Sequence, residues 1–397
     1  CALYSWAISP DTGVCAPDYR FQNTSADSGI SRCTNCNPPI CSSSSTFMVS
    51  ACRMPSAAFW LQGASMLVMA MATRISAQAT AVLRNRRSES VCLVRVRCAA
   101  RALRAMRLRC ALCPRACGVD RTAGERGFCQ MPDHILAARA ALHYWEEPVI
   151  SGSFGSGAVF FSGCTLRCAF CQNGVISQEN FGKEVSSQEL RAAFERLIDE
   201  GCQNINLVTP THFLPSILPA LAPKLPVPVV YNCGGYESVD TLRALEGLVD
   251  IYLPDFKYSD AALAKKLSAA PDYPQIASAA ILEMHQQVGG AVIEDEQMTR
   301  GVIIRHLVLP GCIDNSLGVL DWIADNFPKK DVLVSLMSQY VPMGRAKKLP
   351  PFDRRITQEE YDAVLSYLYL LELDNGYTQD FSAASAEYIP EFDLEGL

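Results

Sequence analysis

The sequence predicts an α/β protein built around a partial, open (βα)6 barrel. From about residue 106 onward, short apolar or β-branched runs alternate with amphipathic segments, and the alternation occurs six times. Such alternation implies parallel strands joined by right-handed crossovers. Six units are too few for the closed eight-fold barrel, so we expect the sheet to stay open.

Composition limits the classes of protein to consider. A chain of 397 residues exceeds the usual size of one domain, and 49% apolar residues are ample for a core. The net charge of −6 argues against nucleic acid as the main partner, although residues 1–109 carry +9 and the remainder −15. The apolar run 57–72 is too short and too interrupted to span a membrane, so no membrane partner is expected.

The chain divides into four predicted parts. Residues 1–105 lack hydrophobic periodicity and are expected to be a disordered or non-native extension, although their Arg-rich, Ser-rich and acid-poor composition also fits a targeting peptide. A Cys-rich module follows over 106–150, and the barrel covers 151–375. The acidic tail 376–397 is expected to cover the barrel edge or to extend into solvent.

Six runs have the length and the β-branched or aromatic content of strands. They are Ala158–Phe161, Asn204–Val208, Val229–Tyr231, Asp250–Leu253, Val302–Leu309 and Val332–Leu336.

Helices between these strands carry recognisable start signals. Ser186-x-x-Glu189 is a capping box before Leu190–Leu197, and Thr357-x-x-Glu360 is a second one before Tyr361–Leu371. Ser238 precedes the shorter apolar segment Val239–Leu245. These signals predict helices at the expected places between strands.

Three cysteines, Cys164, Cys168 and Cys171, directly follow the first predicted strand. Chemistry in such folds collects where strands end. Thiolates suit both zinc and iron–sulfur clusters, but a closed zinc site needs a fourth ligand, and the next cysteine is the distant Cys202. A zinc site completed by a distant residue is the alternative. Three thiolates would leave one iron of a four-iron cluster open to a substrate or cofactor.

The pattern C-x3-C-x-aromatic-C, with Phe170 as the aromatic, resembles the radical S-adenosylmethionine (SAM) superfamily. The string Gly163–Ser177 is similar to the subgroup described as pyruvate formate-lyase activating enzyme-like. The resemblance covers about residues 108–375 and leaves out 1–105. Later segments agree with it: Asn204–His212, Val230–Asn232, Gly234–Tyr236, Asp250–Tyr258 and Arg305–Gly311.

The resemblance implies a [4Fe–4S] cluster on the three cysteines, with SAM chelated by the open iron. Reduction of SAM would give methionine and a 5′-deoxyadenosyl radical that abstracts a hydrogen atom. It further implies a flavodoxin or ferredoxin as electron donor and a glycine of a partner protein as substrate. A small-molecule substrate is the alternative, and a Cys-rich zinc-binding interaction module is the non-enzyme alternative. Cysteines used in metal sites suggest a reducing compartment, the cytoplasm.

Residues at the strand ends are the candidates for SAM binding. Many radical SAM enzymes have a Gly-Gly-Glu stretch after the second strand, but this chain has Thr209, Thr211 and His212 there, which would have to substitute as acceptors. Alternatively, Thr209 with Pro210 ends the strand and caps the next helix. Asn232 ends the third strand and is followed by two glycines, Gly234 and Gly235, that permit close approach of a ligand.

Charged residues at the later strand ends complete the SAM candidates. Asp255 and Lys257 share one face of an extended segment, and the resemblance implies that they face SAM; an exposed ion pair is the alternative. Arg305 and His306 alternate, so one must point inward: Arg305 would suit the SAM carboxylate, and His306 fits a satisfied core histidine equally well. Gln339 and Tyr340 close the sixth strand and are candidates for the substrate entrance.

A second cysteine group, Cys110, Cys113, Cys117 and Cys129, precedes the barrel in a turn-rich segment. Four cysteines within a short stretch resemble a small metal-stapled module. Ligand type alone leaves zinc, an auxiliary iron–sulfur cluster and free thiols open.

Overall fold

The computed structural model describes residues 19–21, 94–381 and 390–397. Contacts divide the chain into one unit of Cys1–Asn23 with Val91–Leu397 and a second unit of Thr24–Ser90, which lies outside the described residues. Most of the predicted extension 1–105 therefore lies outside them too. Within the described part of the chain, no helix is both long and apolar enough to cross a membrane.

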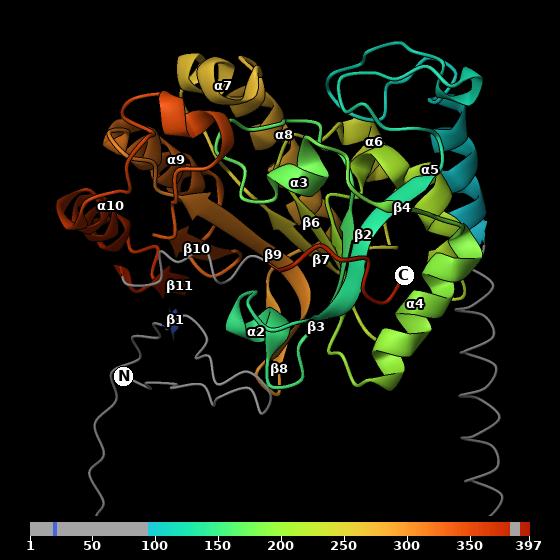
Figure 1. Ribbon diagram of the computed structural model, residues 1–397. Coiled ribbons are helices and arrows are strands. Elements are labelled where there is room, and N and C mark those ends of the chain that lie inside the picture. Colours follow the sequence, from blue (N-terminus) through green and yellow to red (C-terminus); the bar gives the residue numbers. More distant parts are fainter. Residues whose placement is uncertain (1–18, 22–93, 382–389) are drawn as a thin grey trace, which may run out of the picture. The chain divides into compact units, whose positions relative to one another are not determined.

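Six parallel strands in sequential order form the centre of the fold (Figure 1). They confirm the six strands predicted from the sequence and the α/β class. The sheet is open, with its path ending at β1 and β4. The parallel strands are β3 (Ser156–Phe161), β5 (Ile205–Val208), β6 (Val229–Cys233), β7 (Ile251–Pro254), β9 (Gln297–Leu307) and β10 (Leu333–Met337).

Five further strands extend the sheet, and the sequence did not predict them. On one side β2 pairs antiparallel with β3 and with β4; on the other β11 pairs parallel with β10 and antiparallel with β1, while β8 forms a hairpin with β9. β11 falls inside the predicted tail 376–397. Their bounds are β1 (Tyr19–Phe21), β2 (Ile135–His143), β4 (Lys183–Val185), β8 (Val292–Glu294) and β11 (Gly376–Gln379).

Helices connect the parallel strands. Both predicted capping boxes are present, at the start of α4 and of α10, whereas Ser238 at the start of α6 makes no side-chain cap bond. The α-helices are α2 (Pro148–Ser151), α3 (Gly174–Ser177), α4 (Ser187–Asp199), α5 (Leu214–Ile217), α6 (Val239–Arg243), α7 (Ala261–Ser268), α8 (Tyr273–Val288), α9 (Ile313–Asn326) and α10 (Gln358–Leu370). Short 3₁₀ helices occur at Arg121–Ala123, Thr211–Phe213, Leu218–Leu221 and Gly344–Lys348.

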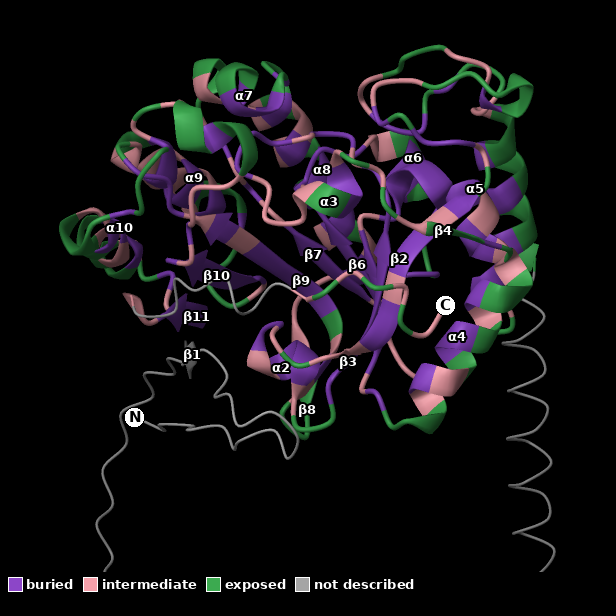
Figure 2. Ribbon diagram, in the orientation of Figure 1, coloured by how far each residue is buried: buried purple, intermediate pink, exposed green. Residues whose placement is uncertain are grey.

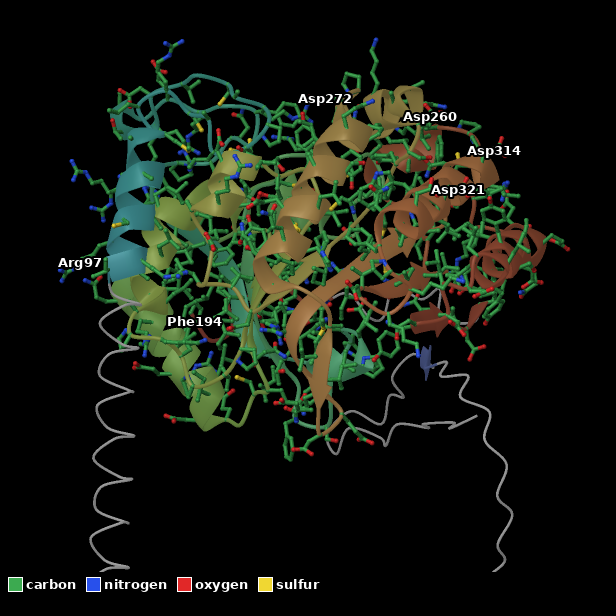
Figure 3. The ribbon with its side chains drawn as sticks, turned by 180° about the vertical axis from the view of Figure 1, so that it is seen from behind. Arg97, Phe194, Asp260, Asp272, Asp314 and Asp321 are labelled. Carbon is green, nitrogen blue, oxygen red and sulfur yellow. The ribbon has the colours of Figure 1, made fainter. Side chains whose placement is uncertain are left out.

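The core lies on both faces of the parallel strands (Figure 2). All residues of β3, β5, β6, β7 and β10 are buried. This is the pattern of a parallel sheet whose two faces are covered, and it explains the near-continuous apolar runs in the sequence. Seen from behind, Phe194 of α4 is directed into the molecule (Figure 3).

A helix over residues 94–105 packs on this core. Val96, Ala99, Ala100 and Leu103 form its buried face, at the spacing of one helical stripe. Arg97 projects outward from the same helix (Figure 3). This segment was assigned to the extension on composition, yet it contributes to the main core.

The last residues of the chain, 390–397, lie against β2. The Ala140 amide donates to the Glu395 carbonyl oxygen at 2.9 Å, and the Leu394 amide donates to the Ala138 carbonyl oxygen at 3.1 Å. Phe392 packs edge-on against Phe160 of β3, with ring centroids 5.5 Å apart. Residues 390–397 thus cover the part of the sheet where β2 pairs antiparallel with β3.

Candidate functional site

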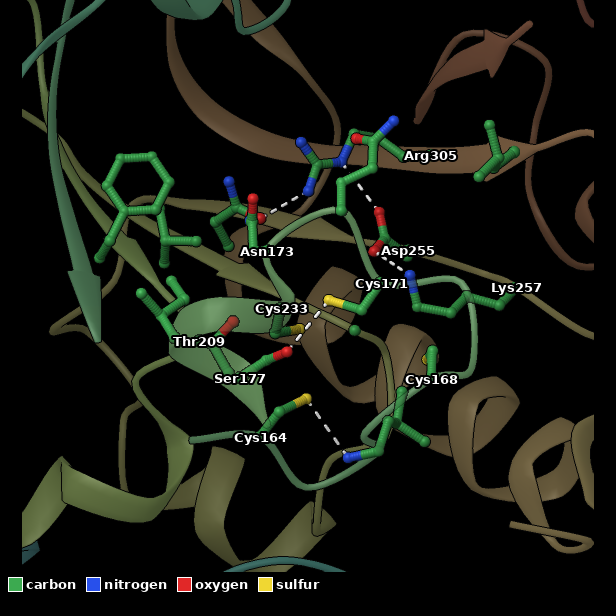
Figure 4. Close-up of a pocket in the computed structure, with 18 of the residues that line it drawn as sticks. Cys164, Cys168, Cys171, Asn173, Ser177, Thr209, Cys233, Asp255, Lys257 and Arg305 are labelled. Carbon is green, nitrogen blue, oxygen red and sulfur yellow. Dashed lines mark hydrogen bonds and ion pairs between the residues drawn. The ribbon is translucent and has the colours of Figure 1, made fainter. Parts of the chain in front are cut away.

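The cysteine loop, residues 162–173 between β3 and α3, brings the three predicted ligands to one cavity (Figure 4). Cys164, Cys168 and Cys171 all line this cavity of about 260 Å³. All three are free thiols. The cavity lies where β3, β5, β6, β7 and β9 end, which is where the fold class predicts the chemistry.

Each of the three sulfur atoms accepts a hydrogen bond. The Leu166 amide lies 3.4 Å from Cys164 Sγ, Ser268 Oγ lies 3.0 Å from Cys168 Sγ, and Ser177 Oγ lies 3.2 Å from Cys171 Sγ. Donors aimed at sulfur suit thiolates, because metal-bound sulfur keeps negative charge that a hydrogen bond stabilises.

Burial keeps the thiols of Cys164 and Cys171 protonated until a cation binds. It raises the pKa of Cys164 to about 12, with the neighbouring cysteines adding to the effect. Burial likewise raises the pKa of Cys171, and Cys168 adds to it. Binding of a metal group would therefore release protons.

Among the described residues, no three or more His, Cys, Asp or Glu side chains are grouped closely enough to hold a single metal ion. A four-iron cluster is larger than one ion, so its thiolate ligands stand further apart. Three free thiols with sulfur-directed donors around one cavity fit such a cluster.

A network of buried charges faces the thiols across the cavity. Arg305 Nη1 lies 2.9 Å from Glu146 Oε2, and Arg305 Nε lies 3.0 Å from Asp255 Oδ1. Arg305 Nη2 donates to Asn232 Oδ1 at 2.5 Å. Lys257 Nζ lies 2.5 Å from Asp255 Oδ2, and both side chains are seen in Figure 4. Asp255 and Lys257 side chains are only 18% and 19% exposed, so the pair is not the exposed ion pair of the alternative prediction.

The two cations keep Asp255 ionised. Burial alone would raise the pKa of Asp255, but Lys257 and Arg305 outweigh it and hold that pKa below its usual value. Burial would lower the pKa of Lys257, but Asp255 and then Cys168 raise it overall. Lys257 is therefore a permanent cation beside the cysteine loop.

Glu146 and His143 line the cavity but were not predicted from the sequence. Glu146 is buried and also accepts from the amides of Asn206 at 3.0 Å and Asn232 at 3.1 Å. Burial lowers the pKa of His143 to about 4, so its ring is neutral near pH 7. Both residues lie at or after β2, a strand that the sequence did not reveal.

Most of the predicted SAM-binding residues line the same cavity as the cysteines, whereas Thr211 and His212 do not. Thr209, Asn232, Asp255, Lys257 and Arg305 line it. Gln339 and Tyr340 line it as well.

Thr211 lies outside the cavity lining. Its hydroxyl is buried and bonds Glu237 Oε1 at 2.9 Å and the Tyr231 hydroxyl at 3.2 Å. Thr209 directly follows β5 with a φ of 59°, and Pro210, which makes no side-chain cap bond, occupies the N-cap of the next 3₁₀ helix. The side chain of Thr209 is thus placed at the cavity and not in a cap.

His212 and His306 are buried core histidines, and of the two only His306 has both ring nitrogens hydrogen-bonded. His212 Nε2 lies 2.6 Å from the Ser162 carbonyl oxygen, and burial lowers its pKa to about 3. His306 lies between the Phe256 carbonyl oxygen at 2.7 Å and Ser316 Oγ at 2.9 Å, and burial lowers its pKa to about 4. Strand alternation therefore directs Arg305 to the cavity and His306 to the core, as one of the two predicted arrangements requires.

Glycine is needed at position 235 for the packing of the backbone, whereas the sequence predicted close approach of a ligand. Its φ is 77°, and a Cβ there would lie 2.1 Å from the Asp255 carbonyl oxygen. The close approach is between the ends of β6 and β7. Gly234, by contrast, lines the cavity.

The second cysteine group lies in the segment that precedes β2. Cys110, Cys113 and Cys129 are buried and Cys117 is exposed; all four are free thiols. Burial raises the pKa of Cys110, Cys113 and Cys129, and each is raised further by another cysteine of the group. The four side chains are therefore near one another, but the described residues do not group them closely enough for a single ion.

Arg115 joins this segment to the cysteine loop. Its guanidinium donates to the carbonyl oxygens of Thr165 at 2.9 Å, Ser268 at 2.8 Å and Ala269 at 2.5 Å. It also stacks on Phe128, 3.9 Å from the ring centre. One side chain thus links three segments that are distant in sequence.

Comparisons with known proteins place the chain near one sequence relative. No family model matches it. The uncharacterized protein MJ0674 of Methanocaldococcus jannaschii is 34% identical over 276 residues, which cover 67% of this chain and 75% of that protein.

Solved structures give only weak likenesses. Streptococcus suis SuiB bound to precursor peptide SuiA aligns with 56% of this chain and 48% of its own, at 14% identity and a TM-score of 0.38. SuiB bound to S-adenosylmethionine aligns with 56% and 50%, at 13% identity and a TM-score of 0.39. The chain spans about half the length of these structures, and TM-scores this low do not establish a shared fold.

Proposed function

We propose that this chain, which belongs to the family of the uncharacterized protein MJ0674, is a radical SAM enzyme. The observation that carries the proposal is the meeting of three free thiols, Cys164, Cys168 and Cys171, at one cavity at the ends of parallel strands. The spacing of these cysteines in the sequence resembles that superfamily, and the hydrogen bonds to their sulfurs support the same proposal.

A [4Fe–4S] cluster bound there would supply the electron that cleaves SAM to methionine and a 5′-deoxyadenosyl radical, the species that abstracts a hydrogen atom. The protein would bind three of the four irons through Cys164, Cys168 and Cys171. Lys257 places a buried positive charge beside the loop, which offsets the negative charge of the thiolates.

The polar residues of the cavity suit the amino-acid end of SAM. Thr209 and Asn232 offer side-chain oxygens to its amino group, and Arg305 with Lys257 offers positive charge to its carboxylate. The carboxylates of Glu146 and Asp255 hold Arg305 in position, so the cation is oriented before a ligand binds.

A glycine of a partner protein is our proposed hydrogen donor, with a flavodoxin or ferredoxin supplying the electron. This part rests on the resemblance of Gly163–Ser177 to activating enzymes. A small-molecule substrate would use the same residues for SAM. Formation of 5′-deoxyadenosine with and without candidate partner proteins separates the two, because only a protein substrate makes the product depend on the partner.

The test of the proposal is anaerobic reconstitution with iron and sulfide. The wild-type protein should turn brown, bind about four irons per chain for one cluster or about eight for two, and, after dithionite reduction, convert SAM to methionine and 5′-deoxyadenosine. Cys168→Ala should abolish both the colour and the product. Cys202→Ala, a buried cysteine outside the cavity, is the matched control and should retain both.

Two results would contradict the proposal. One is a normal cluster spectrum in Cys168→Ala. The other is a wild-type protein that takes up zinc in place of iron and leaves SAM intact, which would favour the zinc-binding interaction module.

A further inference from the structure

Cys168 differs from the other two cysteines of the loop in the origin of its hydrogen bond. Cys164 and Cys171 accept from near neighbours in the sequence, Leu166 and Ser177. Cys168 accepts from Ser268, the last residue of α7, which is 100 positions away along the chain. A contact of this kind depends on the tertiary fold and not on the loop itself.

The serine is part of a chain of two hydroxyl groups. The Tyr258 hydroxyl lies 2.7 Å from Ser268 Oγ, and Ser268 Oγ lies 3.0 Å from Cys168 Sγ. Tyr258 is fully buried and Ser268 is 1% exposed. Water is therefore kept from both hydroxyls, and their partners are set by the protein.

Proton counting fixes the direction of these hydrogen bonds. A thiolate that ligates iron has no proton, so Ser268 must donate to Cys168. A serine hydroxyl has one proton, so Tyr258 must then donate to Ser268. With a metal group bound, proton counting thus gives the order Tyr258 to Ser268 to Cys168, and Tyr258 also lies close enough to interact with Cys168 itself.

Several contacts hold this pair of hydroxyls in place. The Ala169 amide donates to the Leu267 carbonyl oxygen at 2.7 Å, which joins the cysteine loop to the end of α7. Arg115 donates to the Ser268 carbonyl oxygen at 2.8 Å. The Tyr258 ring packs edge-on against Tyr273, with centroids 5.1 Å apart.

We propose that Tyr258 and Ser268 form a buried hydroxyl relay that raises the reduction potential of a cluster bound through Cys168. The inference rests on the proposed function. Hydrogen bonds to cluster sulfurs are among the factors that set cluster potentials. A reduced cluster carries one more negative charge, so donation to its thiolate stabilises the reduced form more than the oxidised form. Both residues are positioning residues, and the quantity that they set is a potential.

The experiment is an EPR-monitored redox titration of the reconstituted full chain without SAM. Ser268→Ala should lower the ratio of reduced to oxidised cluster about fivefold at a fixed applied potential, the size expected for one hydrogen bond. That change equals a midpoint about 40 mV more negative, since tenfold corresponds to 59 mV for one electron. Tyr258→Phe should shift the midpoint in the same direction by less, because Ser268 keeps its hydroxyl.

Matched variants separate this role from a loss of packing. Ser268→Thr keeps the hydroxyl and should retain a midpoint near the wild-type value. Ser156→Ala and Tyr361→Phe remove buried hydroxyls that bond Asn204 and the Gln379 carbonyl oxygen, away from the cavity lining, and should not shift the midpoint.

An unchanged midpoint in Ser268→Ala with full iron content would overturn the relay while leaving the proposed function intact. Equal shifts in Ser268→Thr and Ser268→Ala would overturn it too, because the hydroxyl would then not be the cause. If Ser268→Ala does not assemble a cluster, an unshifted midpoint in Tyr258→Phe overturns it and a negative shift supports it. A wild-type protein that forms no cluster would overturn the proposed function and the relay together.

Discussion

At the scale of single residues, Arg305 shows how far the sequence could lead. Strand alternation predicted that either Arg305 or His306 points inward, and the burial cost of a guanidinium predicted an anionic partner. The partners found in the protein are Glu146 and Asp255. Glu146 could not be foreseen, because a lone carboxylate in the sequence carries no sign of which distant strand end it will meet.

Replacing Arg305 by Met should strongly destabilise the fold. The variant leaves two buried carboxylates with less positive charge, and breaking a buried ion pair costs about 3–5 kcal/mol in the free energy of unfolding. Urea unfolding followed by circular dichroism measures this loss. Lys329→Met is the control, because its pair with Glu372 is more than half exposed and is worth under about 1 kcal/mol. Similar losses in the two variants would contradict the buried network.

Glu237 makes stability depend on pH. Burial raises its pKa to about 7, although Thr211 and Tyr231 act in the opposite direction by donating to it. An unfolded chain has a glutamate pKa near about 4.3. Between these two values the folded protein keeps a proton that the unfolded chain has lost. The free energy of unfolding therefore falls by about 1.4 kcal/mol per pH unit as pH rises through this window.

The variant Glu237→Gln removes this dependence. Urea unfolding at about pH 5, 6, 7 and 8 should show the variant gaining stability relative to the wild type up to about pH 7, with no further change above it. Parallel stability curves for the two proteins over the whole range would show that the carboxyl group is not buried as described.

At the scale of elements, the burial of a strand determined whether that strand could be predicted from the sequence. The six parallel strands are covered on both faces, so their sequences are continuous apolar runs that stand out. β2 was missed because Ile135–His143 is rich in alanine, which has a low strand propensity, and contains Arg139. The capping boxes of α4 and α10 were predictable because they depend on residues only three apart.

Gly235→Ala tests the packing of two strand ends. The added Cβ would meet the Asp255 carbonyl oxygen at 2.1 Å in a left-handed backbone, so we expect a loss of about 3 kcal/mol or more. Gly201→Ala is the matched control, since Gly201 also has a positive φ of 91° but nothing within 4 Å of its Cβ position. It should cost about 1–2 kcal/mol, the backbone part alone. Urea midpoints compare the two, and equal losses would contradict the steric argument.

At the scale of the whole molecule, composition misassigned the start of the folded part around residues 94–105. An excess of arginine and a lack of acids grouped this segment with the residues before it. Its helical stripe of small and apolar residues nevertheless packs on the core. The stripe has only four members, which are too few to stand out in the sequence against an irregular neighbourhood.

Leu103→Ala tests whether this helix contributes to global stability. Leu103 is fully buried, so truncation should lower the free energy of unfolding by about 2–5 kcal/mol. Leu108→Ala, at a side chain that is 57% exposed, should change it by less than about 0.5 kcal/mol. Differential scanning calorimetry would show the two melting temperatures, and an unshifted melting temperature for Leu103→Ala would mean that the helix melts independently.

The hydrogen bonds that Arg115 makes have a consequence for ligand binding by the whole protein. Its guanidinium donates hydrogen bonds to the carbonyl oxygens of Thr165 and Ser268, and Arg115 itself belongs to the segment before β2 that carries the four cysteines of the second group. Where the bridging conformation is also the one that binds a ligand better at the cavity, a ligand that stabilises the segment raises affinity at the cavity, and a ligand in the cavity raises affinity at the segment by the same factor. Ligand binding at the two regions would then be cooperative, whichever ligand is added first. A measurement of affinity at one region would report whether the other region is occupied.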